Sequence, residues 1–573
     1  MNKPDRSGAP RPGVPRRRVL AGLAGAGAAA CAGSLLAGCG PSSPAASADL
    51  GHSKRYGGNL RAGLTGGSSA DTVDPHKAVT DLDISRVQTL YEPLVTLDIQ
   101  ARDVQYLLAQ EIIPRNGSLT DWVIRLRPGI TFHDGTPFTA DDVLFSFRRI
   151  VSLDAPGKIF LGPIDLGATS KMDSQTVVVK LTSPVADYGG ALAAAPFDLL
   201  IAPEGFNPAR PNGTGPFRYH SFTPGQRSVF TRNPHYWQHP LPYASTLTII
   251  DFPDTTSLAN ALTTGQVDAA GTLDPPQVPA LSTTSGVKVV VSQAGSIIPF
   301  TMRVDQPPFS DVRVRQAMRL LVDRPQMIDS ALDSYGTTAG DVFSPYDPDF
   351  DHALHREQDI PQARYLLKQA GQDGLKVTLV TSPVLSGVVA MATVLAEQAT
   401  AAGVTVTLKN VPPGTFFGPD YLNWTFSQDY YSYFPYLTQV GQSMLPGSPF
   451  NETHNDNPRY TSLYQQAQAT ADTALRREIL YQMQQIDFTE GGYIIPAFTD
   501  TLDAYSDTIT GYAPSRLGQP LMNFGFAHFA FTADLGGQGS VTNRRTDTQH
   551  TAQEQRRARL HDKLGKLLSG DPE

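Results

Sequence analysis

Residues 122–147 read WVIRLRPGITFHDGTPFTADDVLFSF, and this stretch decides how the surrounding chain is organised. Apolar residues recur at every second position from Trp122 to Leu126, a period that is typical of a half-buried strand. The Pro-Gly pair that follows predicts a turn. Residues 130–132 are short and mostly apolar, which predicts a second strand. The first half of the stretch therefore predicts a hairpin.

The second half of the stretch predicts a turn and then a capped helix. The turn is formed by His133-Asp134-Gly135. Thr139 stands three residues before Asp142, the spacing of a capping box, and acidic residues suit the positive end of a helix dipole. Apolar residues then recur at helical spacing. His133 and Asp134 could be mistaken for a catalytic pair, but within this phrase we expect them only to shape the turn.

The whole stretch resembles the signature of the family 5 extracellular solute-binding proteins, the peptide- and nickel-type receptors of ABC importers. The resemblance covers roughly residues 55–530 and continues in other phrases of the chain. These phrases are DPH (74–76), YEPLV (91–95), GTGPFRY (213–219), RNPHYW (232–237) and PPFSDVRVRQAM (307–318). The resemblance implies an α/β, two-lobed, hinged periplasmic-binding-protein-like fold of type II, with an additional inserted domain.

Two strand–helix–strand patterns support the two lobes. A strand over 247–252, a helix capped by Thr255 or Thr256 and a strand over 267–270 form one unit, and such short crossovers imply parallel strands. A strand over 375–381, a helix over 384–402 and a strand over 404–408 form the other. Ser310 is the expected cap of the helix that begins the second lobe. The expected domains are a signal peptide (1–39), a linker (40–54), lobe I (55–92, 213–300 and 497–533), an inserted domain (93–212), lobe III (301–496) and a polar tail, disordered or partly helical (534–573).

The N-terminus predicts export and lipid anchoring. Arg16-Arg17-Arg18 precedes an apolar run that ends in Leu-Ala-Gly-Cys39, a lipobox whose cysteine receives a lipid. The arginines favour the twin-arginine export route over the general secretory one. We therefore expect an extracytoplasmic protein attached to the outer face of the cell membrane through Cys39. The chain has two cysteines, and the other, Cys31, lies inside the signal, so the mature body has no thiol nucleophile or disulfide.

Composition and motifs exclude several functions. The 573-residue chain has 40% hydrophobic and 17% charged residues and a net charge of −8, which indicates a globular acidic protein and disfavours nucleic-acid binding. No Gly-x-Ser-x-Gly or His-Glu-x-x-His motif occurs, and no His/Asp cluster has metal-ligand spacing. We therefore expect a monomer with no catalytic residues, no metal and no cofactor.

The stretch 423–436, NWTFSQDYYSYFPY, has the densest ligand-binding chemistry in the chain, with one carboxylate among many aromatic side chains. In peptide-type members of the family, an aromatic-x-x-Asp-Tyr run supplies a carboxylate for the peptide α-ammonium. The resemblance places Phe426 at the aromatic position and Asp429 at the acid, although the family usually has Trp there and an acid after the Tyr. The other expected pocket residues are Trp424 and Tyr430 and, after the DPH phrase, Val79, Thr80 and Asp81.

Alternatives remain for these residues and for the function. Asp429 could make only a loop hydrogen bond, and the aromatic residues could belong to the core. The predicted function is a lipoprotein receptor that captures short peptides between its lobes and delivers them to an ABC permease and its ATPase. The same receptor could instead bind oligosaccharides or another small solute. A secreted hydrolase is a third hypothesis, disfavoured by the missing motifs.

Overall fold

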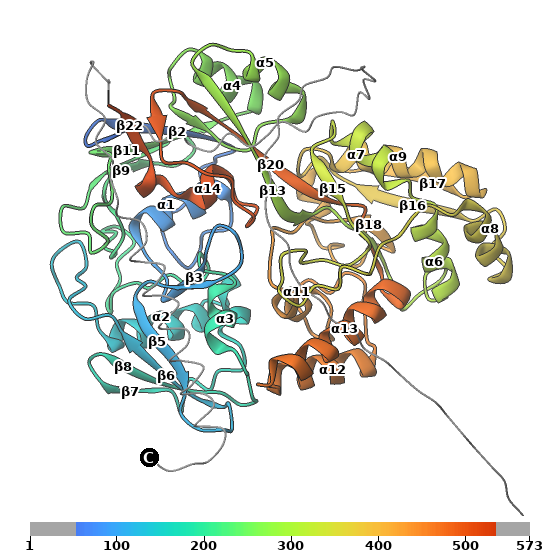
Figure 1. Cartoon of the computed structure of the whole chain (residues 1–573), viewed down its shortest axis with the longest axis horizontal. Coiled ribbons are helices and arrows are strands. Elements are labelled where there is room, and N and C mark those ends of the chain that lie inside the picture. Colours follow the sequence, from blue (N-terminus) through green and yellow to red (C-terminus); the bar gives the residue numbers. More distant parts are fainter. Residues whose placement is uncertain (1–52, 534–573) are drawn as a thin grey trace, which may run out of the picture. The chain divides into compact units, whose positions relative to one another are not determined.

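The computed structural model describes residues 53–533. The predictions for the export signal, for Cys39, for most of the linker and for the tail from 534 lie outside this range. The described residues form five β-sheets with helices packed against them (Figure 1). Within this range no helix combines the length and the apolar character that crossing a membrane requires.

The largest sheet has eight strands and belongs to the first lobe. Its order is β13-β20-β12-β2-β11-β10-β9, with β15 paired to β20. Strand β2 lies between β11 and β12 and is parallel to both, so the predicted strand–helix–strand unit is confirmed with β2 inserted between its two strands. The strands are β2 (Asn59–Thr65), β9 (Phe217–Thr223), β10 (Arg227–Arg232), β11 (Thr246–Phe252), β12 (Ala269–Ala270), β13 (Val287–Ile297), β15 (Gly336–Thr338) and β20 (Ala497–Ser506).

Helices α1 (Asp81–Leu90) and α4 (Thr255–Thr263) contact this sheet. The cap predicted for α4 was wrong. Asp254, rather than Thr255 or Thr256, caps the helix, and its carboxylate accepts the Ser257 N–H at 2.7 Å. Three possible caps follow one another here, and the helix begins directly after the first. A small sheet of β1 (Lys54–Arg55), β22 (Ala530–Thr532) and β21 (Ile509–Thr510) brings the two ends of the described range together.

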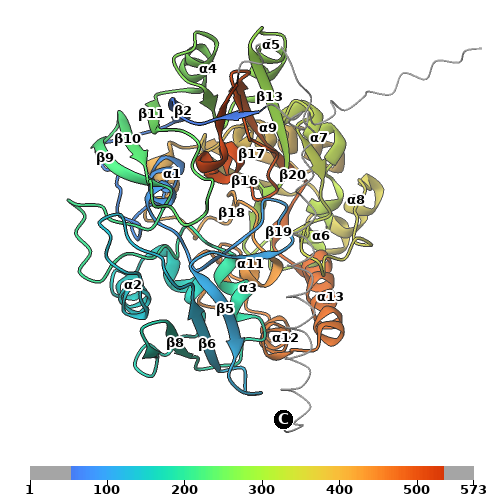
Figure 2. The ribbon, with the colours of Figure 1, turned by 60° about the vertical axis from the view of Figure 1, so that its left-hand side comes forward.

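The inserted segment has its own antiparallel sheet and core. Its strands are β5 (Ala109–Pro114), β6 (Asp121–Leu126), β8 (Thr176–Lys180) and β7 (Ser170–Asp173), in that spatial order. Helix α2 (Ala140–Ser152) contacts β7 and β8, and Figure 2 shows it beside the sheet that contains β5, β6 and β8. Strand β6 confirms the predicted first strand. The strand predicted over 130–132 was wrong, because β6 already pairs with β5 and β8 on its two edges, leaving only the single bridge Thr131–Pro137.

The predicted capping box of α2 is confirmed. The Asp142 carboxylate accepts the Thr139 N–H at 2.7 Å and the Thr139 hydroxyl at 3.1 Å. The apolar residues at helical spacing, including Val143 and Phe147, are fully buried in the core of the inserted segment. The remaining elements of this segment are β3 (Val95–Leu97), β4 (Val104–Tyr106), the 3₁₀ helix η1 (Pro156–Leu161) and α3 (Tyr188–Ala193).

A five-stranded sheet, of order β17-β16-β18-β14-β19, lies in the part of the chain predicted as lobe III, and that name is kept for it below. The predicted parallel pairing of β16 with β17 is confirmed. The helix between them begins later than expected, at Val388. The cap predicted at Ser310 was wrong, because α6 begins at Val312 and the next residue, Asp311, caps it by accepting the Arg313 N–H. The elements are β14 (Phe300–Met302), β16 (Lys376–Thr381), β17 (Thr405–Asn410), β18 (Phe426–Gln428), β19 (Tyr493–Ile494), α6 (Val312–Leu320), α7 (Arg324–Ala331), α8 (Ile360–Gln369), α9 (Val388–Ala399), α11 (Tyr436–Ser443), α12 (Pro458–Ala469) and α13 (Thr473–Glu490).

Two neighbouring antiparallel strands, β13 and β20, lead from the first sheet into lobe III (Figure 1). Their register breaks between Ser292 and Ser296. A side-chain carbon at Gly295 would lie 2.5 Å from the Tyr433 ring, so this glycine allows the 423–436 segment to lie against the crossing. Ile297 also exchanges backbone hydrogen bonds with Tyr431 at 2.9 and 3.0 Å. The segment with the predicted binding residues is therefore fixed to the connection between the lobes.

The phrases that carry the family resemblance contact one another. His133 Nε2 lies 3.0 Å from the Gly215 carbonyl, and His133 Nδ1 accepts the Gly213 N–H at 3.3 Å. Burial lowers the pKa of His133 to about 4, so the ring is neutral at pH 7. Likewise, Glu92 accepts hydrogen bonds from Tyr236 and Trp237. The residues of these phrases connect the inserted segment to the first lobe, and His133 contributes to this connection through its hydrogen bonds.

Candidate ligand-binding site

Asp429 lies directly after β18 and is held by fixed donors. Its side chain is 4% exposed. Its Oδ2 accepts the Tyr421 hydroxyl at 2.7 Å, and its Oδ1 accepts the Tyr430 N–H at 2.8 Å. Burial raises the pKa of Asp429 to about 6, against the opposing effect of these hydrogen bonds. The geometry thus orients a carboxyl group that has lost most of its contact with water.

A second carboxyl group, that of Glu452, reaches Asp429 from a separate loop. The two side chains lie close enough together that the charge of Asp429 raises the pKa of Glu452. Glu452 is also buried, and its Oε1 accepts the Tyr431 hydroxyl at 2.5 Å. Within residues 53–533 neither carboxyl group forms an ion pair with a lysine, arginine or histidine. Because an isolated buried charge is costly, this site favours a cation supplied from outside the chain.

Two of the predicted aromatic wall residues pack inside lobe III. Phe426 is 1% exposed and lies between the rings of Phe300 and Phe309, with centroid distances of 6.4 and 5.2 Å. It supports the site from the core and offers no open wall, because β18 is an interior strand between β16 and β14. Trp424 is half-buried and stacks on Phe416 at 6.4 Å. For both residues the core-packing alternative describes the contacts observed.

The other predicted residues gather near Asp429. Tyr430 is 42% exposed and Val79 is 68% exposed. Thr80 caps α1 by accepting the Asp83 N–H at 3.2 Å. Burial raises the pKa of Asp81 to about 6, and the Asp81 charge is near enough to raise the pKa of Tyr430, after burial. Asp81 at the start of α1 therefore acts on Tyr430, and a role of Val79, Thr80 and Asp81 in ligand binding stays a prediction.

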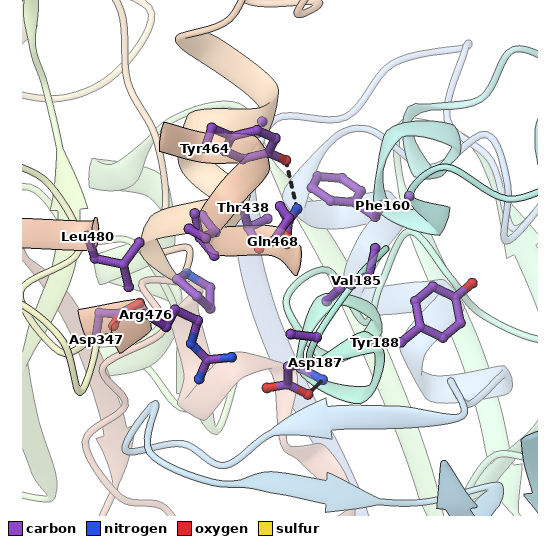
Figure 3. A pocket seen from close by; sticks show the side chains of 18 of the residues that line it. Phe160, Val185, Asp187, Tyr188, Asp347, Thr438, Tyr464, Gln468, Arg476 and Leu480 are labelled. Atoms are coloured by element: carbon purple, nitrogen blue, oxygen red, sulfur yellow. Dashed lines mark hydrogen bonds between the residues drawn. The ribbon is translucent and has the colours of Figure 1, made fainter. Parts of the chain in front are cut away.

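A cavity of about 760 Å³ lies between the inserted segment and helices α11 to α13 (Figure 3). This volume is typical of small-molecule and peptide sites. Tyr433 and Pro435 line it, so it is reached by the segment that carries Asp429. Asp429 and Tyr433 are four residues apart, so their Cα atoms are separated by at most about 15 Å. Apolar side chains, including Phe160 and Leu480, form much of the wall.

Arg476 is a cation of this cavity with open donors, and its charge acts on the buried Asp347. It lies in the first turn of α13 and points into the cavity, toward Asp187 (Figure 3). Its guanidinium group makes no hydrogen bond or ion pair with any residue in the described range, whereas its neighbour Arg477 is paired with Asp349 at 2.8 Å. A guanidinium group presents five N–H donors that match a carboxylate. The cavity is therefore chemically suited to an anionic group.

Direct contacts join the inserted segment to lobe III around the cavity. The rings of Phe160 and Phe434 stack at 5.8 Å with an interplanar angle of 10°. The Ala186 N–H donates to the Gln468 carbonyl at 2.6 Å. These contacts describe a closed arrangement of the two parts, which the domains of a hinged receptor adopt around a ligand.

Sequence reasoning missed Glu452, Tyr421 and Arg476. Glu452 and Arg476 are far from Asp429 along the chain, Tyr421 lies eight residues before it, and no motif or periodicity marks any of the three. Among residues 53–533 no group of three His, Cys, Asp or Glu side chains is arranged to hold a metal ion.

The sequence profile of bacterial extracellular solute-binding proteins, family 5 (middle part), matches residues 103–468, which is more than half of the chain. This chain belongs to family 5. The family 5 protein is similar to the glutathione-binding protein GsiB of Salmonella typhi, with 28% identity over 326 residues. That alignment covers 55% of this chain and 62% of GsiB, less than two thirds of the relative. The GsiB of Escherichia coli O1:K1 is 24% identical over 469 residues, covering 78% of this chain and 90% of the relative.

Solved structures confirm the fold of the family 5 protein. DppA from Helicobacter pylori in complex with peptide STSA matches with a TM-score of 0.72 and 19% identity, covering 84% of this chain and 99% of DppA. AppA from Bacillus subtilis in complex with a nonapeptide matches with a TM-score of 0.69 and 21% identity, covering 84% of this chain and 100% of AppA. These likenesses show the two-lobed type II fold. The relatives and neighbours are binding proteins, not enzymes, so the hydrolase hypothesis is not supported.

Proposed function

We propose that this family 5 protein is the receptor of an ABC importer and captures short peptides with a free amino terminus. The observation that carries the proposal is the buried pair of Asp429 and Glu452, which lacks a cation within the described chain. A peptide α-ammonium would supply the missing charge and three donors. Oligosaccharides could stack on the aromatic side chains, but they provide no positive charge, so the site favours an amine.

The distal end of the ligand is proposed to enter the cavity lined by Tyr433. Its apolar walls accept varied side chains, and Arg476 is the residue proposed to meet the ligand carboxylate. The names of the GsiB relatives add glutathione to the ligands worth testing, because it is a small peptide with a free amino group. AppA and DppA, which share the fold, were solved with peptides.

The setting of the receptor is also proposed. Export through the twin-arginine route, lipidation of Cys39 and delivery of the ligand by a monomer to a permease and ATPase follow from the N-terminal motifs and the family. Cys39→Ala should move the protein from the membrane fraction to the soluble extracytoplasmic fraction and abolish incorporation of labelled fatty acid. Continued labelling of the Cys39→Ala protein would contradict lipidation at this position.

The ligand proposal is tested by calorimetry on the full-length protein in mild detergent. The probes are trialanine, N-acetyl-trialanine, glutathione and maltotriose. We expect binding of a free-amine probe, and a 10- to 100-fold loss for Asp429→Asn, the size of a hydrogen bond to a charged group. The exposed Asp420 lies in the preceding loop, and Asp420→Asn serves as the matched control. Binding of maltotriose alone, or equal affinity for trialanine and its acetylated form, would overturn the proposal.

A further inference from the structure

The Asp429–Glu452 pair requires a proton. Two carboxylates cannot hydrogen-bond to each other, because each would present only acceptors. The two residues are 4% and 3% exposed, and they lie close enough together that the charge of Asp429 raises the pKa of Glu452. Two negative charges in one buried site repel each other, so one of the two groups is a neutral carboxylic acid that can donate to the other.

The surroundings of the pair contain further acids and no base. The ionisable groups that act on it are four tyrosines: Tyr421, Tyr430, Tyr431 and Tyr493. Burial raises the pKa of each, so all four are neutral at pH 7, and the hydroxyl groups of Tyr421 and Tyr431 donate to the pair. No lysine, arginine or histidine of the described range pairs with either carboxyl group. The proton therefore has to stay within the pair while the site is empty.

The fixed donors decide which residue holds the proton. Asp429 accepts the Tyr430 backbone N–H at 2.8 Å and the Tyr421 hydroxyl at 2.7 Å, one on each oxygen. A backbone N–H cannot rotate away, so it always favours the ionised form of Asp429. Glu452 accepts the Tyr431 hydroxyl at 2.5 Å, and a hydroxyl group can rotate. Burial also raises the pKa of Glu452 well above its usual range.

We propose that Glu452 is a positioning residue which, protonated, donates a hydrogen bond to the Asp429 carboxylate and so presents it to the ligand ammonium as a single, oriented negative charge. The inference rests on the proposed function, because it assigns Glu452 a role at the same anchor. Glu452 itself stays behind Asp429 and does not touch the ligand. The site thus carries one charge for one ammonium group, although it contains two acidic residues.

Two substitutions distinguish three possible roles of Glu452: a hydrogen-bond donor to Asp429, a second negative charge for the ligand, and a side chain that only fills space. Glu452→Gln keeps a donor for Asp429 and an acceptor for Tyr431 but cannot ionise. We expect it to bind trialanine or glutathione within about threefold of the parent. Glu452→Leu removes both hydrogen bonds, and we expect at least a tenfold loss. Asp456→Asn, an exposed acid in the same loop, is the matched control. A loss in Glu452→Gln as large as in Glu452→Leu would overturn the proposal, because it would mean that Glu452 acts through its charge.

The pH dependence of ligand affinity also tests this role, because it would not change if Glu452 only filled space. Ammonium binding requires ionised Asp429, so affinity should rise as the pH rises through about 6, with release of up to one proton per ligand below that pH. Calorimetry in buffers of different ionisation enthalpy measures the release. The midpoint should stay in place in Glu452→Gln and move upward in Glu452→Leu, where Asp429 loses a donor that favours its ionised form. An unmoved midpoint in Glu452→Leu would contradict the role.

A ligand-free measurement keeps the inference separate from the proposed function. Infrared difference spectroscopy of the parent protein against Glu452→Gln at pH 7 should show the loss of one protonated carboxyl stretch. If this band is present while neither trialanine nor glutathione binds at any pH, the proposed ligand class fails and the proton assignment stands. If the band is absent, the assignment to Glu452 fails whatever binds.

Discussion

Two of the buried carboxyl groups of lobe III, those of Asp341 and Asp429, have opposite surroundings. Asp341 pairs with Arg324 at 2.9 Å and with Arg356 at 2.6 Å, and it accepts the Ile495 N–H at 2.9 Å. Burial alone would raise the pKa of Asp341, but the charges of these two arginines hold it below its usual range. Asp429 is equally buried, is surrounded by tyrosines and Glu452, and has a raised pKa.

The difference separates a structural acid from a binding acid. Asp341 joins α7 to the chain before β20 and is fully neutralised inside the protein. Asp429 is oriented by hydrogen bonds but lacks a countercharge, so its negative charge is compensated only when a cation binds. Burial does not distinguish the two residues, because both are buried. The charged and neutral groups around each carboxyl distinguish the structural acid from the binding acid.

Removing each charge should change stability in opposite directions. Asp341→Asn leaves the guanidinium groups of Arg324 and Arg356 without a negative countercharge, and we expect a loss of about 3–5 kcal/mol in the free energy of unfolding. Asp429→Asn removes a buried charge that has no partner, so ligand-free stability at pH 8 should stay equal or increase. Urea unfolding of both variants and the parent measures this. Similar losses in both would remove the distinction between the two acids.

The pH dependence of ligand-free stability should sharpen the same contrast. Native Asp429, with a pKa of about 6 against 3.8 in the unfolded chain, binds more protons than the unfolded state between these values. Stability should therefore fall as pH rises through this window, by about 3 kcal/mol at 1.4 kcal/mol per pKa unit. Asp341 has a lowered pKa, so its contribution is present above 3.8 and lost as pH falls below it.

Other buried acids also titrate, so the Asp429 contribution is the difference between the parent and Asp429→Asn. Asp487 and Asp503, both raised by burial to a pKa of about 7, contribute equally to the two proteins and cancel. Parallel stability curves from pH 4 to 8 would show that Asp429 is not the buried, uncompensated acid described above.

Much of the fold could be predicted because its signals are local. The apolar period of β6, the capping box at Thr139 and Asp142, and the parallel pair β16 and β17 each depend on neighbouring residues. The failures have local causes too. The strand predicted over 130–132 had no free edge to join, and at α4 three successive capping residues gave the sequence no means of choosing.

The site could be predicted only in part because long-range contacts assemble it. The phrase around Asp429 was found through its resemblance to a family, but its partner Glu452 comes from another loop and is marked by no motif. Phe426 lies in a strand of three residues, too short for alternation to show that it faces the core. Arg476 is one of two adjacent arginines, and only the structure shows that Arg477 is paired and Arg476 is open.

The two ends of the ligand should respond to different substitutions. Arg476→Gln is expected to weaken trialanine about tenfold, the lower range for a charged hydrogen bond, and to leave trialanine amide unchanged. Arg477→Gln is the matched control, because its guanidinium is already paired with Asp349. Calorimetry with both probes tests this. An equal loss for the acid and the amide would show that Arg476 does not meet the ligand carboxylate.

The smallest effect is expected at the contact between Phe160 and Phe434, which touches neither acid. Their stacking joins the inserted segment to lobe III, and such an aromatic pair is worth about 0.5–1.5 kcal/mol. Phe434→Leu should lower the closed population and so weaken every ligand by the same factor, up to about tenfold. Trialanine, its amide and glutathione should all lose affinity alike, with an unchanged pH midpoint. A loss confined to one probe would instead place Phe434 in direct contact with that ligand, because a closure equilibrium cannot distinguish among ligands that all require the closed form.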